Sequence, residues 1–162
     1  MDKVIVIAGP TASGKTDLAI ELALRINGEI ISADSMQIYR EMNIGTAKPT
    51  MEERKGIPHH MLDIVDPDEE FSVAQFQQGA KKCIKDILSR GKVPIVAGGT
   101  GLYINALVYN ITFSETITDW NYRNQLQNIA REQGPEALHT LLQEVDPISA
   151  ENIHPNNVKR VI

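Results

Sequence analysis

The chain has 162 residues, of which 42% are hydrophobic and 23% are charged, and its formal net charge is −5. This length and composition predict one globular domain with a hydrophobic core, and they exclude a disordered or collagen-like protein. The acidic balance argues against functions that need a strongly basic surface, because neutralising nucleic-acid phosphates takes clustered Lys and Arg. The one cysteine, Cys83, excludes an intramolecular disulfide and favours a reducing compartment.

The first apolar segment, Val4 to Ala8, is rich in β-branched residues and is followed by Gly and Pro. This pattern predicts a strand buried on both faces of a parallel sheet. The run is too short to span a membrane and has no cleavage region after it, so we expect a soluble, cytoplasmic protein without membrane contacts. Helical spacing of apolar residues over 16–26 and a short strand over 29–33 complete a βαβ unit.

Residues 34–58 have no steady period, which predicts a long, functional loop with at most a short helix over 51–55. A short strand is predicted over 60–65. Ser72 and Gln75 then form a capping box that begins a helix running to Arg90.

A further strand is predicted over 93–97 and an apolar helical segment over 102–108. Residues 119–162 are predicted to be wholly helical, with turns at Gln133-Gly134-Pro135, Asp146-Pro147 and His154-Pro155. The last helical pattern has no C-cap signal, which predicts that the polypeptide is a fragment truncated at its C-terminal end.

The strongest motif matches the P-loop pattern in full and lies between the first strand and the first helix: Gly9-Pro10-Thr11-Ala12-Ser13-Gly14-Lys15-Thr16. Its glycines let the backbone wrap an anion, so the motif predicts binding of a diphosphate or a nucleotide. Lys15 would contact the terminal phosphate, and the Thr16 hydroxyl would ligate Mg²⁺. A glycine-rich turn without a ligand is the alternative, which both flanking elements disfavour.

Polar residues also follow the strands predicted over 29–33 and 93–97. Asp34 would lie near the predicted phosphate site, where it could ligate Mg²⁺ through water, act as a general base or cap a turn. Thr100 lies in Gly98-Gly99-Thr100-Gly101 and could donate a hydrogen bond to a substrate, although spacing alone favours a structural turn.

Two other groups of residues fit structural roles better than functional ones. His59 and His60 resemble a metal pair, but adjacent strand residues point to opposite faces, so joint ligation of one ion is geometrically poor. Trp120 and Tyr122 could stack on bases, although a lone aromatic pair is more typical of a partial core.

Taken together, the ordered motifs resemble the tRNA dimethylallyltransferase (tRNA isopentenyltransferase) family. They comprise the P-loop, Asp34-Ser35-Met36-Gln37-Ile38-Tyr39, Gly45-Thr46-Ala47-Lys48-Pro49, Pro58-His59-His60-Met61-Leu62-Asp63, Gly98-Gly99-Thr100-Gly101-Leu102-Tyr103 and the segment 154–162. The resemblance spans essentially the whole chain. It implies an α/β fold, a P-loop NTPase-like parallel sheet with flanking helices, plus a helical insertion.

The resemblance implies three parts: a P-loop catalytic core over 1–114, a helical insertion that grips the anticodon stem over 115–153, and the start of the return to the core over 154–162. The implied reaction transfers a dimethylallyl group from dimethylallyl diphosphate to the exocyclic amine of the adenosine that follows the anticodon in tRNA. The implied partners are therefore tRNA and dimethylallyl diphosphate, and we expect a monomer.

Roles carry over from the family to matching positions. The P-loop, Lys15 and Mg²⁺ on Thr16 would stabilise the leaving diphosphate, and Asp34 would be the general base. The implied catalytic residues are Asp34, Lys15 and Thr100. The implied tRNA contacts are Asp34, Ser35, Met36, Gln37, Thr100, Arg123, Lys159, Arg160, Val161 and Ile162.

This chain is shorter than members of the family. A downstream arginine that helps to hold the diphosphate, and much of the tRNA-binding surface, have no counterpart in it. Three alternatives to the tRNA enzyme therefore stay open. The first is prenyl transfer to free adenine nucleotides, the second is a small P-loop kinase, and the third is a non-catalytic fragment that only binds diphosphate or RNA.

Overall fold

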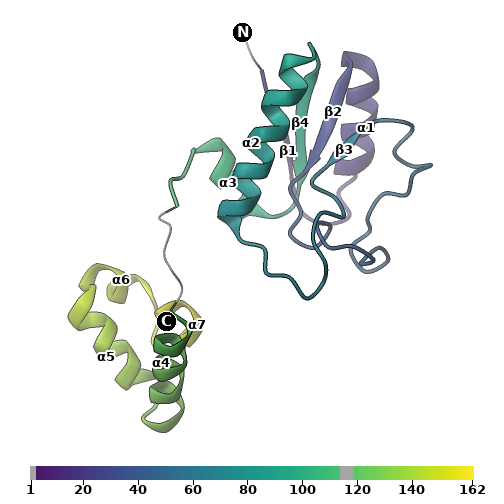
Figure 1. The fold of residues 1–162 in the computed structure, drawn as a ribbon. Coiled ribbons are helices and arrows are strands. Elements are labelled where there is room, and N and C mark those ends of the chain that lie inside the picture. Colours follow the sequence, from purple (N-terminus) through teal and green to yellow (C-terminus); the bar gives the residue numbers. More distant parts are fainter. Residues whose placement is uncertain (1–2, 114–118) are drawn as a thin grey trace. The chain divides into compact units, whose positions relative to one another are not determined.

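The computed structural model describes residues 3–113 and 119–162 and divides the chain into two compact units, Met1–Phe113 and Ser114–Ile162 (Figure 1). The boundary predicted between residues 114 and 115 lies outside the described residues. Among the described residues, no helix is both long and apolar enough to cross a membrane.

The first unit is built on a four-stranded parallel sheet with the strand order β1-β4-β2-β3. Its strands are β1 (Ile5–Ala8), β2 (Gly28–Ser32), β3 (His59–His60) and β4 (Val93–Gly98). The parallel pairing means that the carboxyl ends of these strands meet at one edge, where ligands of open α/β sheets gather.

Helices cover the two faces of this sheet, as Figure 1 shows. On one face α1 (Lys15–Ile26) packs through Ala19, Ile20 and Ala23 against Ile30 and Ile95. On the other face α2 (Val73–Ser89) and α3 (Gly101–Val108) pack against the neighbouring strand residues, Ile31 and Val96. Adjacent strand residues therefore enter opposite cores, and the predicted α/β fold with flanking helices is confirmed.

The helix that follows the long loop begins as predicted. Ser72 Oγ accepts a hydrogen bond from the backbone N–H of Gln75, and the Gln75 side chain in turn accepts one from the Ser72 N–H. Phe76, one residue later, stacks on Tyr103 of α3 with ring centroids 4.0 Å apart. The stack joins α2 to α3 and fixes the helix that follows the Gly98–Gly101 turn.

The prediction that Val4 to Ala8 are buried on both faces is wrong. β1 is the edge strand of the described sheet and pairs only with β4. Ile5 and Ile7 pack against the α1 cluster, whereas Val4 and Val6 are each 40% exposed. An apolar run thus marked a strand with one covered face, because hydrophobicity alone does not reveal how many layers cover it.

The loop contains less regular structure than predicted. Residues 51–56 form turns rather than a helix, and Lys55 and Gly56 have left-handed φ angles of 50° and 76° that break a right-handed helix. The strand expected over 60–65 is only His59–His60, because Met61 and Asp63 have φ values of 60° and 55°. A single parallel bridge between Tyr39 and Val65 extends this edge.

The second unit is wholly helical in its described residues, as predicted. It comprises α4 (Trp120–Glu132), α5 (Pro135–Val145), α6 (Pro147–Asn152) and α7 (Val158–Val161). Proline begins both α5 and α6, where its missing N–H is not needed. Among its described residues, the buried apolar side chains are Leu138 on α5, Ala150 on α6 and Val161 on α7.

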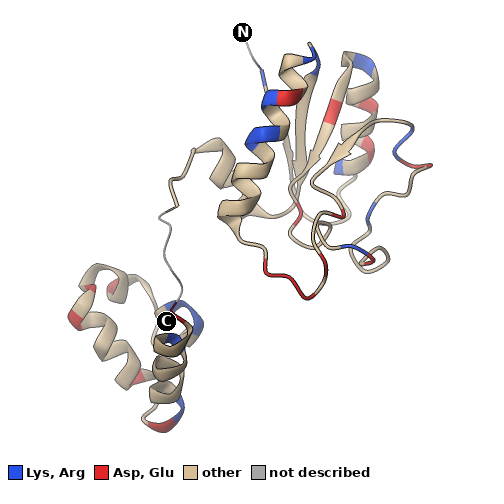
Figure 2. Ribbon diagram, viewed as in Figure 1, with Lys and Arg blue, Asp and Glu red and all other residues tan. Residues whose placement is uncertain are grey.

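Charges are distributed unevenly over the first unit. Figure 2 shows acidic residues along the loop between β3 and α2, and Lys and Arg on α2. One carboxylate is different, because Glu29 on β2 is buried with 1% exposure. It accepts hydrogen bonds from Arg90 Nη2 and Lys92 Nζ, each at 2.7 Å, and lies 2.8 Å from His60 Nε2. The Arg90 guanidinium, helped by Lys92 and His60, holds the pKa of Glu29 well below its usual value.

We expect Glu29→Ala to lower the free energy of unfolding by about 3 kcal/mol, because the change leaves a cationic cluster without its buried counter-charge. Urea denaturation would measure this loss. Asp86→Ala is the matched control, since Asp86 also contacts Arg90 but is 58% exposed, and it should cost less than about 1 kcal/mol. Equal losses in the two variants would contradict the role assigned to Glu29.

The depressed pKa of Glu29 also predicts how stability depends on pH. The native carboxylate stays ionised where the unfolded one, with a usual pKa of about 4.3, takes up a proton. The contribution is therefore present above about pH 4.3 and is lost as the pH falls below it. Glu29→Gln should show a shallower fall in unfolding free energy between pH 5 and pH 3 than the native chain, measured by urea denaturation at each pH.

Candidate active site

The P-loop joins β1 to α1 and leaves the N-terminus of that helix open. Ala12 and Gly14 have left-handed φ angles of 61° and 77°, which turn the chain so that α1 begins at Lys15. Gly14 is the N-cap residue and offers no side chain to the first backbone N–H groups. These donors and the positive end of the helix dipole are therefore available to an anion.

Lys15 supplies a positive charge at this loop. Its ammonium donates a hydrogen bond to the Pro10 carbonyl and lies 3.4 Å from Ser13 Oγ. The side chain thus folds back over the loop that it belongs to. A bound phosphate would be a stronger acceptor for the ammonium than these neutral oxygens.

The ends of β2 and β4 approach each other so closely that only glycine fits at position 98. A Cβ atom there would lie 2.2 Å from the Ala33 carbonyl oxygen. That oxygen accepts a hydrogen bond from the Thr100 N–H at 3.1 Å, while the Ala33 N–H donates to the Ala97 carbonyl at 2.8 Å. The contact places Asp34, which follows Ala33, beside the Gly98–Gly101 turn.

Asp34 is held by its own turn. Its Oδ1 accepts hydrogen bonds from the N–H groups of Met36 at 2.9 Å and Gln37 at 3.3 Å. Ser35, the next residue, donates its N–H to Thr100 Oγ1 at 2.9 Å. Oδ2 has no protein partner within the part of the chain that the structure describes. Asp34 therefore combines a fixed orientation with one carboxylate oxygen available to a substrate.

These segments line a pocket of about 90 Å³. Its lining combines P-loop residues, the residues that follow β2 and β4, and part of the long loop: Thr11, Ala12, Lys15, Thr16, Asp34, Gln37, Thr46, Ala47, Ala97, Gly98 and Gly99. Ser13 and Gly14 line an adjoining hollow, which shares Ala12, Lys15, Thr16 and Ala47 with this pocket. The structure thus brings Asp34 and the P-loop together, as the sequence predicted from strand ends alone.

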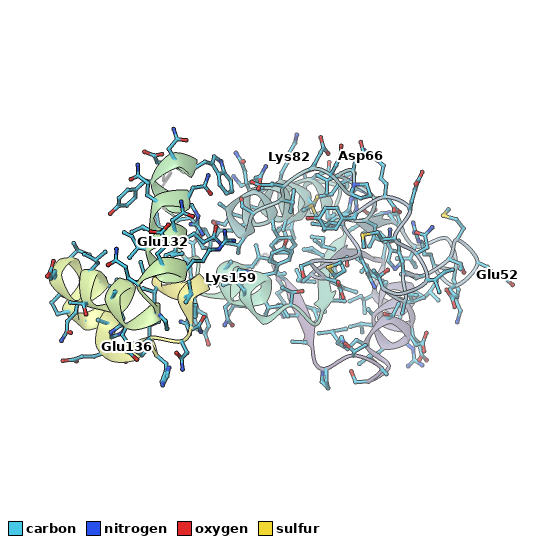
Figure 3. All side chains as sticks on the ribbon, turned by 90° about the horizontal axis from the view of Figure 1, so that it is seen from below. Glu52, Asp66, Lys82, Glu132, Glu136 and Lys159 are labelled. Carbon is cyan, nitrogen blue, oxygen red and sulfur yellow. The ribbon has the colours of Figure 1, made fainter. Side chains whose placement is uncertain are left out.

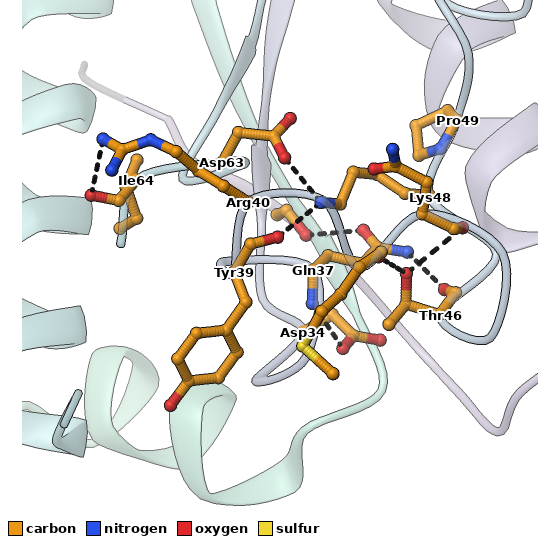
Figure 4. Close-up of polar contacts among 12 residues, drawn as sticks. Asp34, Gln37, Tyr39, Arg40, Thr46, Lys48, Pro49, Asp63 and Ile64 are labelled. Carbon is orange, nitrogen blue, oxygen red and sulfur yellow. Dashed lines mark hydrogen bonds and ion pairs between the residues drawn. The ribbon is translucent and has the colours of Figure 1, made fainter. Parts of the chain in front are cut away.

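Three other residues predicted for this site have different surroundings. Thr100 bonds to Ser35 and does not line the pocket, which fits the structural role that its spacing favoured. Ser35 and Met36 also lie outside the lining, and Met36 is 45% exposed. Gln37 lines the pocket and bonds to the long loop (Figure 4).

The residues predicted in the helical unit lie around a cavity of their own. Arg123, Lys159 and Ile162 line a hollow of about 430 Å³ together with Trp120, Asn124, Gln127 and Val158. Arg160 is exposed, whereas Val161 is buried. Trp120 and Tyr122 are 55% and 58% exposed, so they do not form the partial core that their pattern favoured.

The histidine pair splits between two partners. His60 Nε2 lies 2.8 Å from Glu29, and hydrogen bonds with Cys83 and Glu29 raise the His60 pKa despite burial. His59 Nδ1 donates to the Ile57 carbonyl at 2.8 Å, and burial lowers the His59 pKa. The two imidazoles thus contact different parts of the fold, which matches the alternation expected on a strand.

Sequence reasoning missed the residues that build the pocket wall opposite the P-loop. Thr46 and Ala47 form this wall, and Lys48 and Asp63 form an ion pair behind it (Figure 4). These residues lie in the Gly45–Pro49 and Pro58–Asp63 motifs, which served only to establish the resemblance. Lys48, between Ala47 and Pro49, was a possible signal for this ion pair. Its partner Asp63 is too distant in sequence for the pair to be predicted from local patterns.

Comparison with known proteins identifies the family. The sequence model described as IPP transferase matches residues 37–162, which is more than half of the chain. The chain belongs to the IPP transferase family. It is 66% identical over 162 residues to a tRNA dimethylallyltransferase of Acetivibrio thermocellus, and 58% identical over 161 residues to one of Bacillus mycoides. It covers 52% and 51% of these proteins, so it spans about half the length of the curated relatives it matches.

Solved structures of the IPP transferase family agree with this assignment. The full-length tRNA isopentenylpyrophosphate transferase of Bacillus halodurans matches 99% of the chain with a TM-score of 0.70 and 50% identity, and 53% of that protein is covered. A eukaryotic dimethylallyltransferase acting on tRNA matches 99% of the chain with a TM-score of 0.82 and 39% identity, and 40% of it is covered. Both likenesses therefore extend over nearly the whole chain.

We expect Lys15→Met to weaken the binding of inorganic pyrophosphate at least about tenfold, because the change removes the ammonium that the P-loop places beside the anion. Isothermal titration calorimetry would measure this affinity. Lys82→Met is the matched control, since Lys82 lies exposed on α2 (Figure 3). If both variants bound pyrophosphate as tightly as the native protein, Lys15 would have no part in anion binding.

Proposed function

We propose that the full-length protein transfers a dimethylallyl group from dimethylallyl diphosphate to the exocyclic amine of the adenosine that follows the anticodon in tRNA. One observation supports this proposal above all. In this chain, which belongs to the IPP transferase family, Asp34 lines the same pocket as Lys15 and Thr16. A base and an anion site in one pocket suit a reaction that deprotonates an amine while it expels a diphosphate.

The P-loop would bind the diphosphate of the prenyl donor. The carbon–oxygen bond to the diphosphate breaks, and its electron pair leaves with the diphosphate oxygen. Negative charge thus grows where the open N-terminus of α1 and the Lys15 ammonium lie. Donors that are already oriented stabilise this charge without having to reorganise during the reaction.

Mg²⁺ fits the chemistry of the residues around this pocket. The Thr16 hydroxyl and the Asp34 carboxylate both line it, and hard oxygen donors suit Mg²⁺. No cluster of three or more His, Cys, Asp and Glu side chains able to hold a metal occurs among the described residues. We propose that the Thr16 hydroxyl would hold Mg²⁺, with the diphosphate and water as its other ligands. Bound there, the ion would neutralise charge on the leaving diphosphate.

Asp34 would act on the acceptor, the adenine amine. As the amine nitrogen bonds to the prenyl carbon, its proton passes to the Asp34 carboxylate. Hydrogen bonds from the N–H groups of Met36 and Gln37 fix the orientation of Oδ1, which leaves Oδ2 for the amine. An adenine amine is a weak nucleophile, so holding it in line with the prenyl carbon supplies much of the rate.

The tRNA contacts that we propose fall into two groups. Asp34, Ser35, Met36, Gln37 and Thr100 would surround the target adenosine, which must leave its stack to reach the carboxylate. Arg123, Lys159, Arg160 and Ile162 would contact tRNA from the helical unit, whereas Val161, also carried over from the family, is buried and offers no side chain for such a contact. The exposed Arg160, and the cavity that Arg123 and Lys159 line, support this second group. We also propose that the protein acts as a monomer in the cytoplasm.

We expect Asp34→Asn to reduce prenyl transfer by at least about 10²-fold while pyrophosphate binding stays within twofold of the native protein. Asparagine keeps an oxygen for the Met36 and Gln37 N–H groups but cannot accept the amine proton. Mass spectrometry of prenylated adenosine in tRNA, after reaction with dimethylallyl diphosphate, would measure the transfer. Native-like turnover by this variant would contradict the assignment of Asp34 as the base.

The same assay separates the proposal from its alternatives. Full-length protein would be given equal concentrations of tRNA and AMP together with the prenyl donor. Prenylated AMP in place of prenylated tRNA would indicate an enzyme acting on free nucleotides. Phosphate transfer from ATP without any prenyl donor would indicate a P-loop kinase.

A further inference from the structure

Lys48 is a buried cation that no part of the proposed reaction uses. Its side chain is 3% exposed, and its ammonium donates hydrogen bonds to the Tyr39 carbonyl at 2.6 Å and to Asp63 Oδ1 at 2.5 Å (Figure 4). Removing a lysine from water is costly unless partners of this kind compensate for it. The ammonium thus ties together three segments that are separate in sequence: the loop at 48, the turn at 39 and the segment after β3.

Lys48 lines neither of the two hollows in which a diphosphate would bind. Its neighbours Ala47 and Pro49 both line the hollow beside the P-loop, whereas Lys48 lines neither that hollow nor the main pocket. The side chain points inward, away from both. Its effect on a ligand must therefore pass through the backbone of the loop.

The wall formed by Thr46 and Ala47 is held from a second direction by Gln37. The Gln37 amide donates to the Thr46 carbonyl at 3.1 Å and to the Ala47 carbonyl at 3.4 Å, and its Oε1 accepts from Ser32 Oγ at 3.0 Å. Ala47 itself has a left-handed φ of 48°. A non-glycine residue keeps this unfavourable conformation only where its surroundings enforce it.

We propose that Lys48 and Asp63 are a positioning pair that fixes the Thr46–Ala47 wall against the P-loop and thereby sets the affinity for the diphosphate end of the prenyl donor. This inference rests on the proposed function. Without the ammonium, the Tyr39 carbonyl and Asp63 lose their shared donor. Among the described residues, the other cation paired with Asp63 is Arg54, 4.0 Å from its Oδ2. The wall then relaxes and the pocket that faces Lys15 and Thr16 loosens.

The test uses full-length protein and compares Lys48→Met and Asp63→Asn with the control Arg40→Gln. Arg40 also forms an ion pair with an aspartate of the same segment, Asp66, at 2.8 Å, but both side chains are about half exposed. Steady-state kinetics would give kcat and the KM values for dimethylallyl diphosphate and for tRNA. We expect each pair variant to raise the KM for the prenyl donor about tenfold, with the KM for tRNA unchanged, because small misplacements of binding groups are costly. The control should change neither KM.

The two KM values separate positioning from a general loss of structure. A smaller folded fraction lowers kcat and leaves both KM values unchanged, and that result would overturn the inference. Circular dichroism would show whether each variant folds. If Lys48→Met does not fold, Asp63→Asn decides the matter, and failure of both to fold assigns the pair to stability alone and overturns the inference.

Failure of the proposed function would be visible separately. If the native protein transferred no prenyl group to tRNA, the binding of inorganic pyrophosphate, measured by calorimetry, would replace the KM values. Binding weakened about tenfold in both pair variants, but not in Arg40→Gln, would support the positioning pair even then. Unchanged pyrophosphate binding would overturn it.

Discussion

The close approach of the backbone at Ala33 and Gly98 is the constraint on which the geometry of the site depends. Parallel strands bring β2 and β4 to the same edge, but their ends meet only because residue 98 has no side chain to strike the Ala33 carbonyl. Asp34 and the Gly98–Gly101 turn continue directly from the two contacting residues. The sheet therefore sets the backbone position of Asp34, and the N–H groups of Met36 and Gln37 orient its carboxylate.

Two buried charged groups hold the surroundings of this site in different ways. Glu29 gathers Arg90, Lys92 and His60 near the amino end of β2, so it joins the start of the sheet to the end of α2. Lys48 and Asp63 act at the opposite end, behind the wall that faces the P-loop. Both arrangements tie together segments distant in sequence, which local propensity cannot achieve in a unit with so long a loop.

Local patterns predicted the long helices and strands and the long loop over 34–58, but not the short elements within and just after that loop. The capping box at Ser72 and the P-loop followed by α1 carry their structural signals within a few neighbouring residues. The failures, a helix at 51–55 and a strand at 60–65, occur where non-glycine residues such as Lys55 and Met61 have left-handed φ angles. Tertiary contacts enforce these conformations, so side-chain periodicity does not reveal them.

The same distinction applies to the site. Asp34 and the P-loop could be placed together from sequence, since the carboxyl ends of parallel strands share an edge. The wall of Thr46 and Ala47 could not, because it depends on the pairing of Lys48 with a residue 15 positions away. The exposure of Val6 on β1 could not be predicted from sequence either, because the number of layers that cover a strand is a property of the whole fold.

In the proposed reaction the P-loop holds a diphosphate that leaves intact while the amine of an adenosine is alkylated. Phosphorus NMR of full-length protein with tRNA and dimethylallyl diphosphate would follow the phosphorus-containing product. We expect inorganic pyrophosphate in equal amount to the prenylated adenosine formed. Orthophosphate as the product, or pyrophosphate released without prenylated adenosine, would contradict it.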